Sequence, residues 1–183
     1  MSVQDQIEGL YGALQSRFFG KFKAVVVDNA DPEALGRLLV RVPDVLRDQK
    51  VWAVACVPYA GQMTGGAQTG LFAVPPVDSH VWVEFEGGDP DYPIWVGCQW
   101  IAGQTDSAEA EPGTVVLRNG AGAIRLLEAS GTIVIEAADG SSVSIGDGGI
   151  TLEGSEVTIS ANGSVVTVSA TGFDALNGAL TAT

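Results

Sequence analysis

Histidine and cysteine are scarce in this sequence of 183 residues, and their scarcity excludes several kinds of active site. A nucleophile triad needs a histidine beside its serine or cysteine. The one histidine, His80, lies at the start of a predicted strand, and we interpret it as a structural or surface residue. The two cysteines, Cys56 and Cys98, have no further Cys or His at ligand spacing, so no zinc site is predicted. Both lie in apolar runs, where we expect buried free thiols. We therefore predict no catalytic residue, no metal and no cofactor.

Basic residues are also few: nine Lys and Arg stand against 22 Asp and Glu, which gives a net charge of −13. Such a surface repels phosphate backbones, so nucleic-acid binding is disfavoured. No apolar run reaches the roughly 18–20 residues that a membrane helix needs. The N-terminus also lacks the basic and then apolar pattern of a signal peptide. We therefore expect the protein to be synthesised and folded in the cytoplasm.

Residues 113–183 lack proline and lysine and contain one aromatic residue, Phe173, so an aromatic core is not expected there. What they contain is a series of apolar pairs at positions i and i+2, separated by small polar turns. Side chains alternate across a strand, so both members of a pair face the same way. The pattern predicts a slender β-structured rod. The pairs are Ile124/Leu126, Ile133/Ile135, Val143/Ile145, Ile150/Leu152, Val157/Ile159 and Val166/Val168.

The number of residues per strand favours a rod made by three chains. A single-chain β-helix needs roughly 20 or more residues for each coil, so this segment would give only about three coils with both ends exposed. If three chains wind together, each layer takes one short strand from every chain. The apolar pairs then meet on the axis, and strand edges pair between chains. We therefore predict that these pairs form the core of an intertwined homotrimeric β-helix.

The first part of the chain holds all the tryptophans, tyrosines and prolines, within residues 1–112. Residues 2–19 favour a helix with one apolar face, which either packs on its own domain or serves as a docking arm for a partner. The apolar residues of that face are Val3, Ile7, Leu10, Leu14 and Phe18.

Strands are predicted next over residues 22–27, 36–42, 51–57, 80–85 and 94–100. A Gly-rich loop at 61–70 separates the third from the fourth. Five short strands with a long loop midway suit a small closed barrel of the OB type. The predicted fold is thus all-β, and its parts follow one another along the chain. They are an N-terminal helical arm at 1–19, an OB-fold barrel at 20–102, a polar linker at 103–113, a β-helical shaft at 114–171 and a tip at 172–183.

Four stretches of the barrel region resemble one family in the right order. They are FKAVVVDNADPEALGRLLVRVP at 22–43, WAVACVPYAG at 52–61, LFAVPPVDSHV at 71–81 and VEFEGGDPDYPIWVG at 83–97. They are similar to the OB-fold domain of central spike proteins of contractile-tailed phages, R-type pyocins and type VI secretion, such as baseplate protein V and the VgrG proteins. The last stretch is the most specific, because the family also carries a GGDP turn between two strands.

The resemblance implies an intertwined trimeric β-helix carried below three OB barrels and attached to a baseplate hub. Ile7, Leu10, Leu14 and Phe18 would then contact the hub. The ending TGFDALNGALTAT breaks the strand pattern at Gly172, and Phe173, Leu176 and Leu180 would either close the bottom of the trimer or form a platform for a separate PAAR-like tip protein. For such a platform the predicted contact residues are Phe173, Asp174 and Leu176. Some short spikes hold an iron ion through a His-x-His pair, but this sequence has no histidine after His80.

The sequence therefore predicts a structural central spike at the baseplate of a contractile tail or injection machine. It would attach to the hub and puncture the target envelope mechanically, without acting as an enzyme. The alternative is a trimeric tail fibre or adhesin that binds surface glycans. Adhesins usually present aromatic platforms, and the single aromatic residue of the tail makes this alternative the weaker one.

Overall fold

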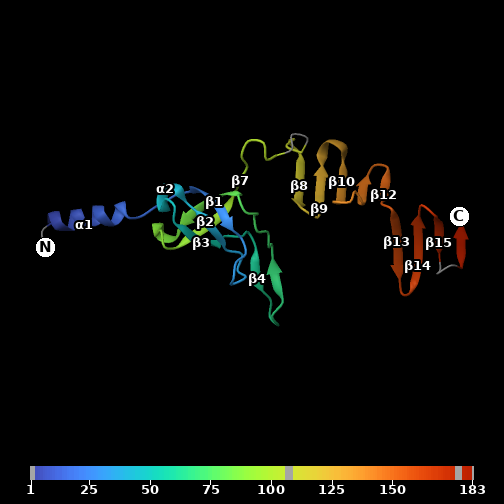
Figure 1. Cartoon of the computed structure of the whole chain (residues 1–183), viewed down its shortest axis with the longest axis horizontal. Coiled ribbons are helices and arrows are strands. Elements are labelled where there is room, and N and C mark those ends of the chain that lie inside the picture. Colours follow the sequence, from blue (N-terminus) through green and yellow to red (C-terminus); the bar gives the residue numbers. More distant parts are fainter. Residues whose placement is uncertain (1–2, 106–108, 176–178, 183) are drawn as a thin grey trace. The chain divides into compact units, whose positions relative to one another are not determined.

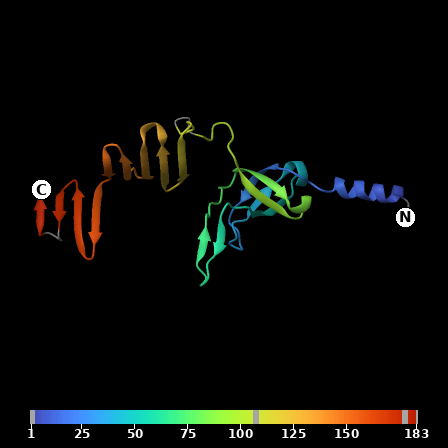
Figure 2. The same cartoon turned by 180° about the vertical axis from the view of Figure 1, so that it is seen from behind.

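The computed structural model describes residues 3–105, 109–175 and 179–182. The chain divides into two compact units, Met1–Gln104 and Thr105–Thr183, and each is described by itself. Figure 1 and Figure 2 show the elements of both units from opposite sides.

A closed barrel forms the centre of the first unit. Its strands are β1 (Phe22–Asp28), β2 (Leu38–Arg41), β3 (Lys50–Ala55), β6 (His80–Phe85) and β7 (Pro93–Gln99), paired in the order β1-β2-β3-β7-β6. The β3–β7 pair is parallel and the other pairs are antiparallel. All five predicted strands are present, and a closed five-stranded barrel is consistent with the OB fold. A short helix, α2 (Pro43–Leu46), was not predicted; Pro43 fits its first turn because proline lacks the N–H that a helix start leaves unpaired.

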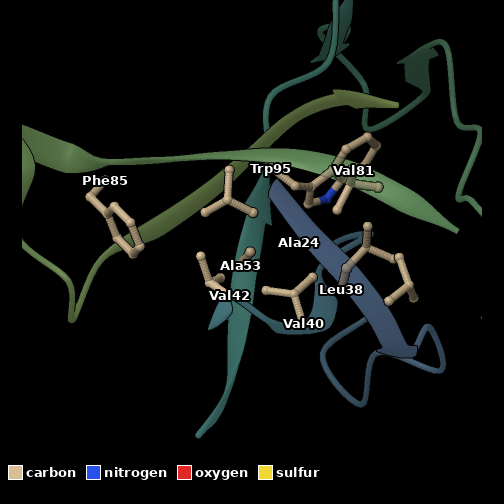
Figure 3. Packing of buried hydrophobic residues seen from close by; sticks show 10 residues of the cluster. Ala24, Leu38, Val40, Val42, Ala53, Val81, Phe85 and Trp95 are labelled. Atoms are coloured by element: carbon tan, nitrogen blue, oxygen red, sulfur yellow. The ribbon is translucent and has the colours of Figure 1, made fainter. Parts of the chain in front are cut away.

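The barrel core is built from the alternation of its strands. In β6 the buried residues are Val81, Val83 and Phe85, while the residues between them face outward. Leu38, Val40 and Val26 are fully buried. Figure 3 shows the labelled core side chains, with Leu38 and Val40 among them, pointing toward one another. The buried Trp95 indole donates a hydrogen bond of 3.1 Å to the Gly36 carbonyl, which satisfies its one polar atom.

A two-stranded ribbon occupies the segment that we predicted as a loop. It consists of β4 (Ala60–Gln62) and β5 (Gln68–Gly70), paired antiparallel and separate from the barrel sheet. Both views show it extending away from the barrel (Figures 1 and 2). The loop expectation at 61–70 was therefore wrong for these strands.

The N-terminal helix α1 spans Val3–Gln15. It ends earlier than the predicted 2–19, so Phe18 is not on the helical face. The Phe18 ring instead packs against the barrel core, with its centroid 6.1 Å from that of Phe22 and 6.2 Å from that of Phe85.

The second unit contains two antiparallel meander sheets. The first has the order β12-β11-β10-β9-β8 and the second the order β13-β14-β15-β16. The strands of the first are β8 (Thr114–Asn119), β9 (Gly122–Leu127), β10 (Thr132–Ala137), β11 (Ser142–Gly146) and β12 (Gly149–Glu153). Those of the second are β13 (Glu156–Ala161), β14 (Ser164–Ser169), β15 (Gly172–Ala175) and β16 (Leu180–Ala182).

This arrangement corrects two expectations. Within each sheet, consecutive strands pair within one chain through short turns, whereas we expected strand edges to pair between chains. The strand pattern also continues past Gly172, where we expected it to break, because β15 begins at that residue and pairs with β14. Glycine is a turn signal in sequence, but it also fits the end of a strand where the backbone takes a positive φ, here 143°.

Candidate functional site: the uncovered faces of the tail sheets

We call the two sheets of the second unit the tail sheets, the first made by β8–β12 and the second by β13–β16. The register of the first tail sheet aligns its apolar residues in two rows. Residues directly opposite one another in an antiparallel pair point to the same face. Following the pairs from β8 to β12 therefore gives two continuous rows on one face. They are Val115-Leu126-Ile133-Ile145-Ile150 and Leu117-Ile124-Ile135-Val143-Leu152.

This apolar face has no covering layer within the described parts of the chain. Nine of its ten side chains are between 40 and 70% exposed. In β10 the apolar Ile133 and Ile135 are more exposed than the polar-face residues Val134 and Glu136 that alternate with them. An antiparallel sheet in water normally packs its apolar face on a core, and the described residues provide no such core for this face.

The opposite face of the same sheet carries the charges. The only basic residues after position 100 are Arg118 and Arg125, and both form ion pairs with Glu109. Arg125 donates from Nε to Glu109 Oε1 over 2.8 Å and also pairs with Glu136 across the β9–β10 ladder. These two carboxylates raise the pKa of Arg125, Glu109 contributing most. The polar face is thus stabilised within one chain, while the apolar face is not.

The second tail sheet repeats the pattern. Its rows on one face are Val157-Val168-Phe173 and Ile159-Val166-Ala175-Leu180. The face behind them presents the polar row Thr158-Thr167-Asp174. Ile159, Val168 and Leu180 are at least half exposed, so this face also lacks a cover within the described residues.

All twelve residues that we predicted as a trimer core lie in these rows, on the apolar faces of the two sheets. Sequence reasoning missed Val115 and Leu117 in β8, although they show the same i, i+2 spacing. It also missed that Phe173, Ala175 and Leu180 extend the rows of the second sheet, because we had assigned them to a separate tip.

The three predicted tip-partner residues do not form one surface. Phe173 lies on the apolar face of the second sheet, opposite Val168. Asp174 is the next residue along the strand, so it lies on the polar face, opposite Thr167. Leu176 lies outside the described residues. Phe173 therefore belongs to the apolar row of the second tail sheet and not to a separate platform.

The GGDP turn of the barrel, residues 87–90, contacts the segment that follows α1, and we call this turn the socket. The Phe18 backbone N–H donates to the Gly88 carbonyl over 2.7 Å, and Arg17 Nη1 lies 2.9 Å from Asp89 Oδ2. Gly88 is buried with a positive φ of 76°, and a Cβ placed there would lie 3.0 Å from the Phe19 ring. The turn therefore requires glycine at position 88 both for its backbone conformation and for the approach of residues 17–19.

The helix that precedes this socket has an exposed apolar face. Ile7 and Leu14, two of the predicted hub residues, are about half exposed, as the hub hypothesis needs. The side chain of Leu10 is outside the described set. Phe18, the fourth predicted hub residue, packs in the barrel and cannot present its ring to a partner at the same time.

Hydrogen bonds to the carboxylate of Asp31 stabilise the connection between β1 and β2. This carboxylate accepts from the backbone N–H groups of Glu33, Leu35 and Arg37 and from the Arg37 guanidinium, the shortest of these bonds being 2.8 Å. The Arg37 hydrogen bonds are the main reason why the pKa of Asp31 lies well below its usual range, and the backbone bonds add to the effect. Arg37 also stacks over Trp52, with its guanidinium carbon 5.5 Å from the ring centroid.

The other predicted site features have mixed outcomes. Cys56 and Cys98 are free thiols, but both are exposed, so our expectation of burial was wrong. No three His, Cys, Asp or Glu side chains of the described residues are grouped so that they could hold a metal ion. Within the same residues, every helix falls short of the length and apolar character that crossing a bilayer requires.

Comparison with known proteins identifies the barrel. Residues 22–100 match the family model of the type VI secretion system/phage-baseplate injector OB domain. The match begins at the first strand of the barrel and ends one residue after its last strand. The resemblance seen in the sequence is thereby confirmed for this region. No curated protein matches the chain.

Proposed function

We propose that this chain, whose residues 22–100 are an OB domain of the phage-baseplate injector family, is the homotrimeric central spike of a contractile injection machine. The match of its barrel to this family supports a role among baseplate components. The observation that carries the finer proposal is the pair of uncovered apolar faces in the second unit. Three copies would cover these faces by turning them toward a common axis.

The energetics favour such an assembly. Full burial of a Val, Leu or Ile side chain contributes about 1.5–3 kcal/mol relative to full exposure. The rows of the first sheet are roughly half exposed, so covering them contributes on the order of 1 kcal/mol per residue before association entropy is counted. The ion pairs of the first sheet involve Arg118, Arg125 and Glu136 of the other face, so closing its apolar face buries none of them.

In the trimer, each chain would supply its sheets as one wall of a three-sided shaft. Each tail sheet has two edge strands, and each edge strand has one side on which no strand of its own sheet pairs with it. The edge strands are β8, β12, β13 and β16. These edges are where strands of neighbouring copies can pair, in place of the layer-by-layer winding of three chains that the sequence predicts. The shaft surface would then be polar, and such a surface suits an object that is driven through an envelope.

The two ends of the chain would have different partners. The exposed apolar residues of α1, including Ile7 and Leu14, would dock on the baseplate hub, and the socket at residues 87–90 would fix that arm to the barrel. The C-terminal sheet would carry a separate PAAR-like tip protein. Sheath contraction would drive the assembly into the target cell, so the protein would act through rigidity and not through chemistry.

The native mass of the full chain is the decisive measurement. A trimer would have about three times the 18.9 kDa mass of one chain, and we expect this species by native mass spectrometry and by light scattering. A monomer at micromolar concentration would contradict the proposal, because the apolar faces would then be stable in water.

Attachment to the hub needs its own experiment. A chain that lacks residues 1–15 removes α1 but leaves the socket residues in place. We expect it to form trimers of normal mass that fail to enter tail-like particles, as followed by immunoblotting of purified particles. Normal incorporation of the truncated trimer would show that α1 is not the hub contact.

A further inference from the structure

Residues 51–77 contain no Asp, Glu, Lys, Arg or His, in a chain whose net charge is −13. Charged residues border the segment on both sides, with Lys50 before it and Asp78 after it. The segment includes β3, which belongs to the barrel, and the whole β4–β5 ribbon. For β3 the lack of charge follows partly from burial. For the ribbon it does not, because the ribbon is exposed.

Apolar side chains are exposed at the turn between β4 and β5 and in the residues that flank the two strands. Phe72 is 75% exposed, Tyr59 61% and Met63 59%. Met63 is at the turn, while Tyr59 and Leu71 are at the base, where the Leu71 N–H donates to the Tyr59 carbonyl over 2.9 Å. Exposed surface on a single domain is normally rich in charge, so an uncharged and partly apolar projection is characteristic of a contact surface.

Both ends of the ribbon are fastened to the barrel. Before it, the Cys56 N–H donates to the Trp95 carbonyl over 3.0 Å. After it, the Asn29 side chain donates to the Pro75 carbonyl over 2.9 Å, and Val74 packs against the core. The two strands are held to each other by a ladder from Ala60↔Gly70 to Gln62↔Gln68. The ribbon is thus placed by the barrel and is not a loose loop.

We propose that the β4–β5 ribbon docks on the barrel of a neighbouring copy of this chain. The proposal rests on the homotrimer proposed above, which brings three acidic barrels together. Copies with the same negative charge repel one another unless their contact surfaces are free of charge. A basic partner would instead be matched by acidic residues, and the ribbon has none.

The dimensions allow this contact. From Tyr59 to Met63, where the turn begins, the ribbon extends about 13 Å, at roughly 3.3 Å per residue. Both views show it reaching beyond its own barrel (Figures 1 and 2). In a cyclic trimer each copy contacts the next head to tail, so every ribbon would have one recipient.

Photo-crosslinking of the full chain tests the proposal. Met63 is replaced by the photoreactive residue p-benzoylphenylalanine, and the purified protein is irradiated without any other component. We expect covalent dimers and trimers on a denaturing gel. The same probe at Asp48, an exposed charged position of the barrel, is the matched control and should give several-fold less product.

A charge variant separates docking from simple misfolding. Gln68→Glu keeps the size of an exposed ribbon residue and adds only a charge to each copy. We expect a several-fold lower crosslinking yield from position 63 at 20 mM salt and recovery toward the parent yield at 500 mM, because salt screens surface charges. A yield that falls equally at both salt concentrations would contradict the electrostatic argument.

The outcomes distinguish this inference from the trimer on which it rests. A trimeric native mass without crosslinked copies would overturn the ribbon contact and leave the trimer intact. Products that appear only when baseplate proteins are added would also overturn it and would assign the ribbon to one of them. A monomeric native mass would overturn both proposals.

Discussion

The barrel and the tail sheets use the same alternation of branched apolar residues, yet only the barrel covers them. In the barrel, Leu38 and Val40 point inward and are fully buried, because the sheet closes on itself. In the tail, Ile133 and Ile145 are direct neighbours across a ladder and are both more than 40% exposed, because the sheet stays open. Strand patterning therefore specifies which face is apolar, and closure of the sheet decides whether a single chain can bury that face.

The difference also concerns where charge is placed. In the barrel unit, the ion pair between Asp31 and Arg37 includes a buried carboxylate, because the Asp31 side chain is only 4% exposed. This carboxylate stabilises the connection between β1 and β2 through its hydrogen bonds. The tail keeps its ion pairs on one exposed face and leaves the other face free of charge. The first arrangement stabilises a single copy, while the second leaves an uncharged apolar face, which is the face that we propose other copies cover.

The largest effect is expected when a charge is placed on an apolar tail face. Ile145→Asp would put one carboxylate from each copy into the covered region, so we expect loss of the trimer and a native mass near 18.9 kDa. Ser144→Asp is the matched control, because the neighbouring residue points to the polar face. If both variants remained trimeric, the apolar face would not be the assembly surface.

A barrel core substitution is expected to have a smaller effect that does not depend on concentration. Leu38→Ala removes a fully buried side chain and should cost about 2–5 kcal/mol of barrel stability. Scanning calorimetry should show a lower barrel transition at all protein concentrations and an unchanged native mass. A concentration-dependent shift would show instead that the barrel is also stabilised by association.

Substitution in the GGDP socket is expected to be weaker again. Gly88→Ala forces a side chain into a positive φ and against Phe19, at a cost of about 1–2 kcal/mol. We expect faster amide exchange at residues 17–19 with the rest of the barrel unchanged. Gly9→Ala in α1, where nothing lies within 4 Å, should leave this exchange unaltered. Equal protection in both variants would show that the socket does not hold the arm.

The pH dependence of the barrel should be the mildest of these effects. The pKa of Asp31 is depressed in the folded state, so its contribution to stability is present above its unfolded pKa of about 4 and is lost as pH falls toward the folded value. The melting temperature of the barrel should therefore decrease as the pH is lowered below about 4. Asp31→Asn should melt lower than the parent at pH 7 and show a flatter acid profile. Parallel profiles would assign the acid sensitivity to other carboxylates.

The sequence was sufficient to predict the barrel strands and the composition of the tail faces. Pro and Gly mark the barrel turns, and the i, i+2 pairs identify the apolar side of each tail strand without any knowledge of pairing. The register could not be predicted, since it depends on turn geometry, and this is why the rows through Val115 and Phe173 were missed. The ribbon was hidden because its glycines and glutamines resemble a loop.

Helical spacing also misled at one position. Leu14 and Phe18 are four residues apart, which fits a helix face, but the chain leaves the helix at Gln15. Packing of Phe18 with Phe22 and Phe85 overrides the local pattern, since an aromatic side chain contributes more when buried in the barrel than on an exposed helix. Tertiary contacts of this kind are not visible in residue spacing.

The hairpin connections of the tail have a consequence for how the shaft would be made. Within each sheet, every strand pairs with the next one in sequence, so a wall forms from contacts between residues that are close along the chain. Contacts of low sequence separation form quickly. Three walls that meet after they have formed do not need to thread through one another. The assembled shaft would then be free of entanglement. The lifetime of the trimer would be set by the rate at which the apolar faces separate.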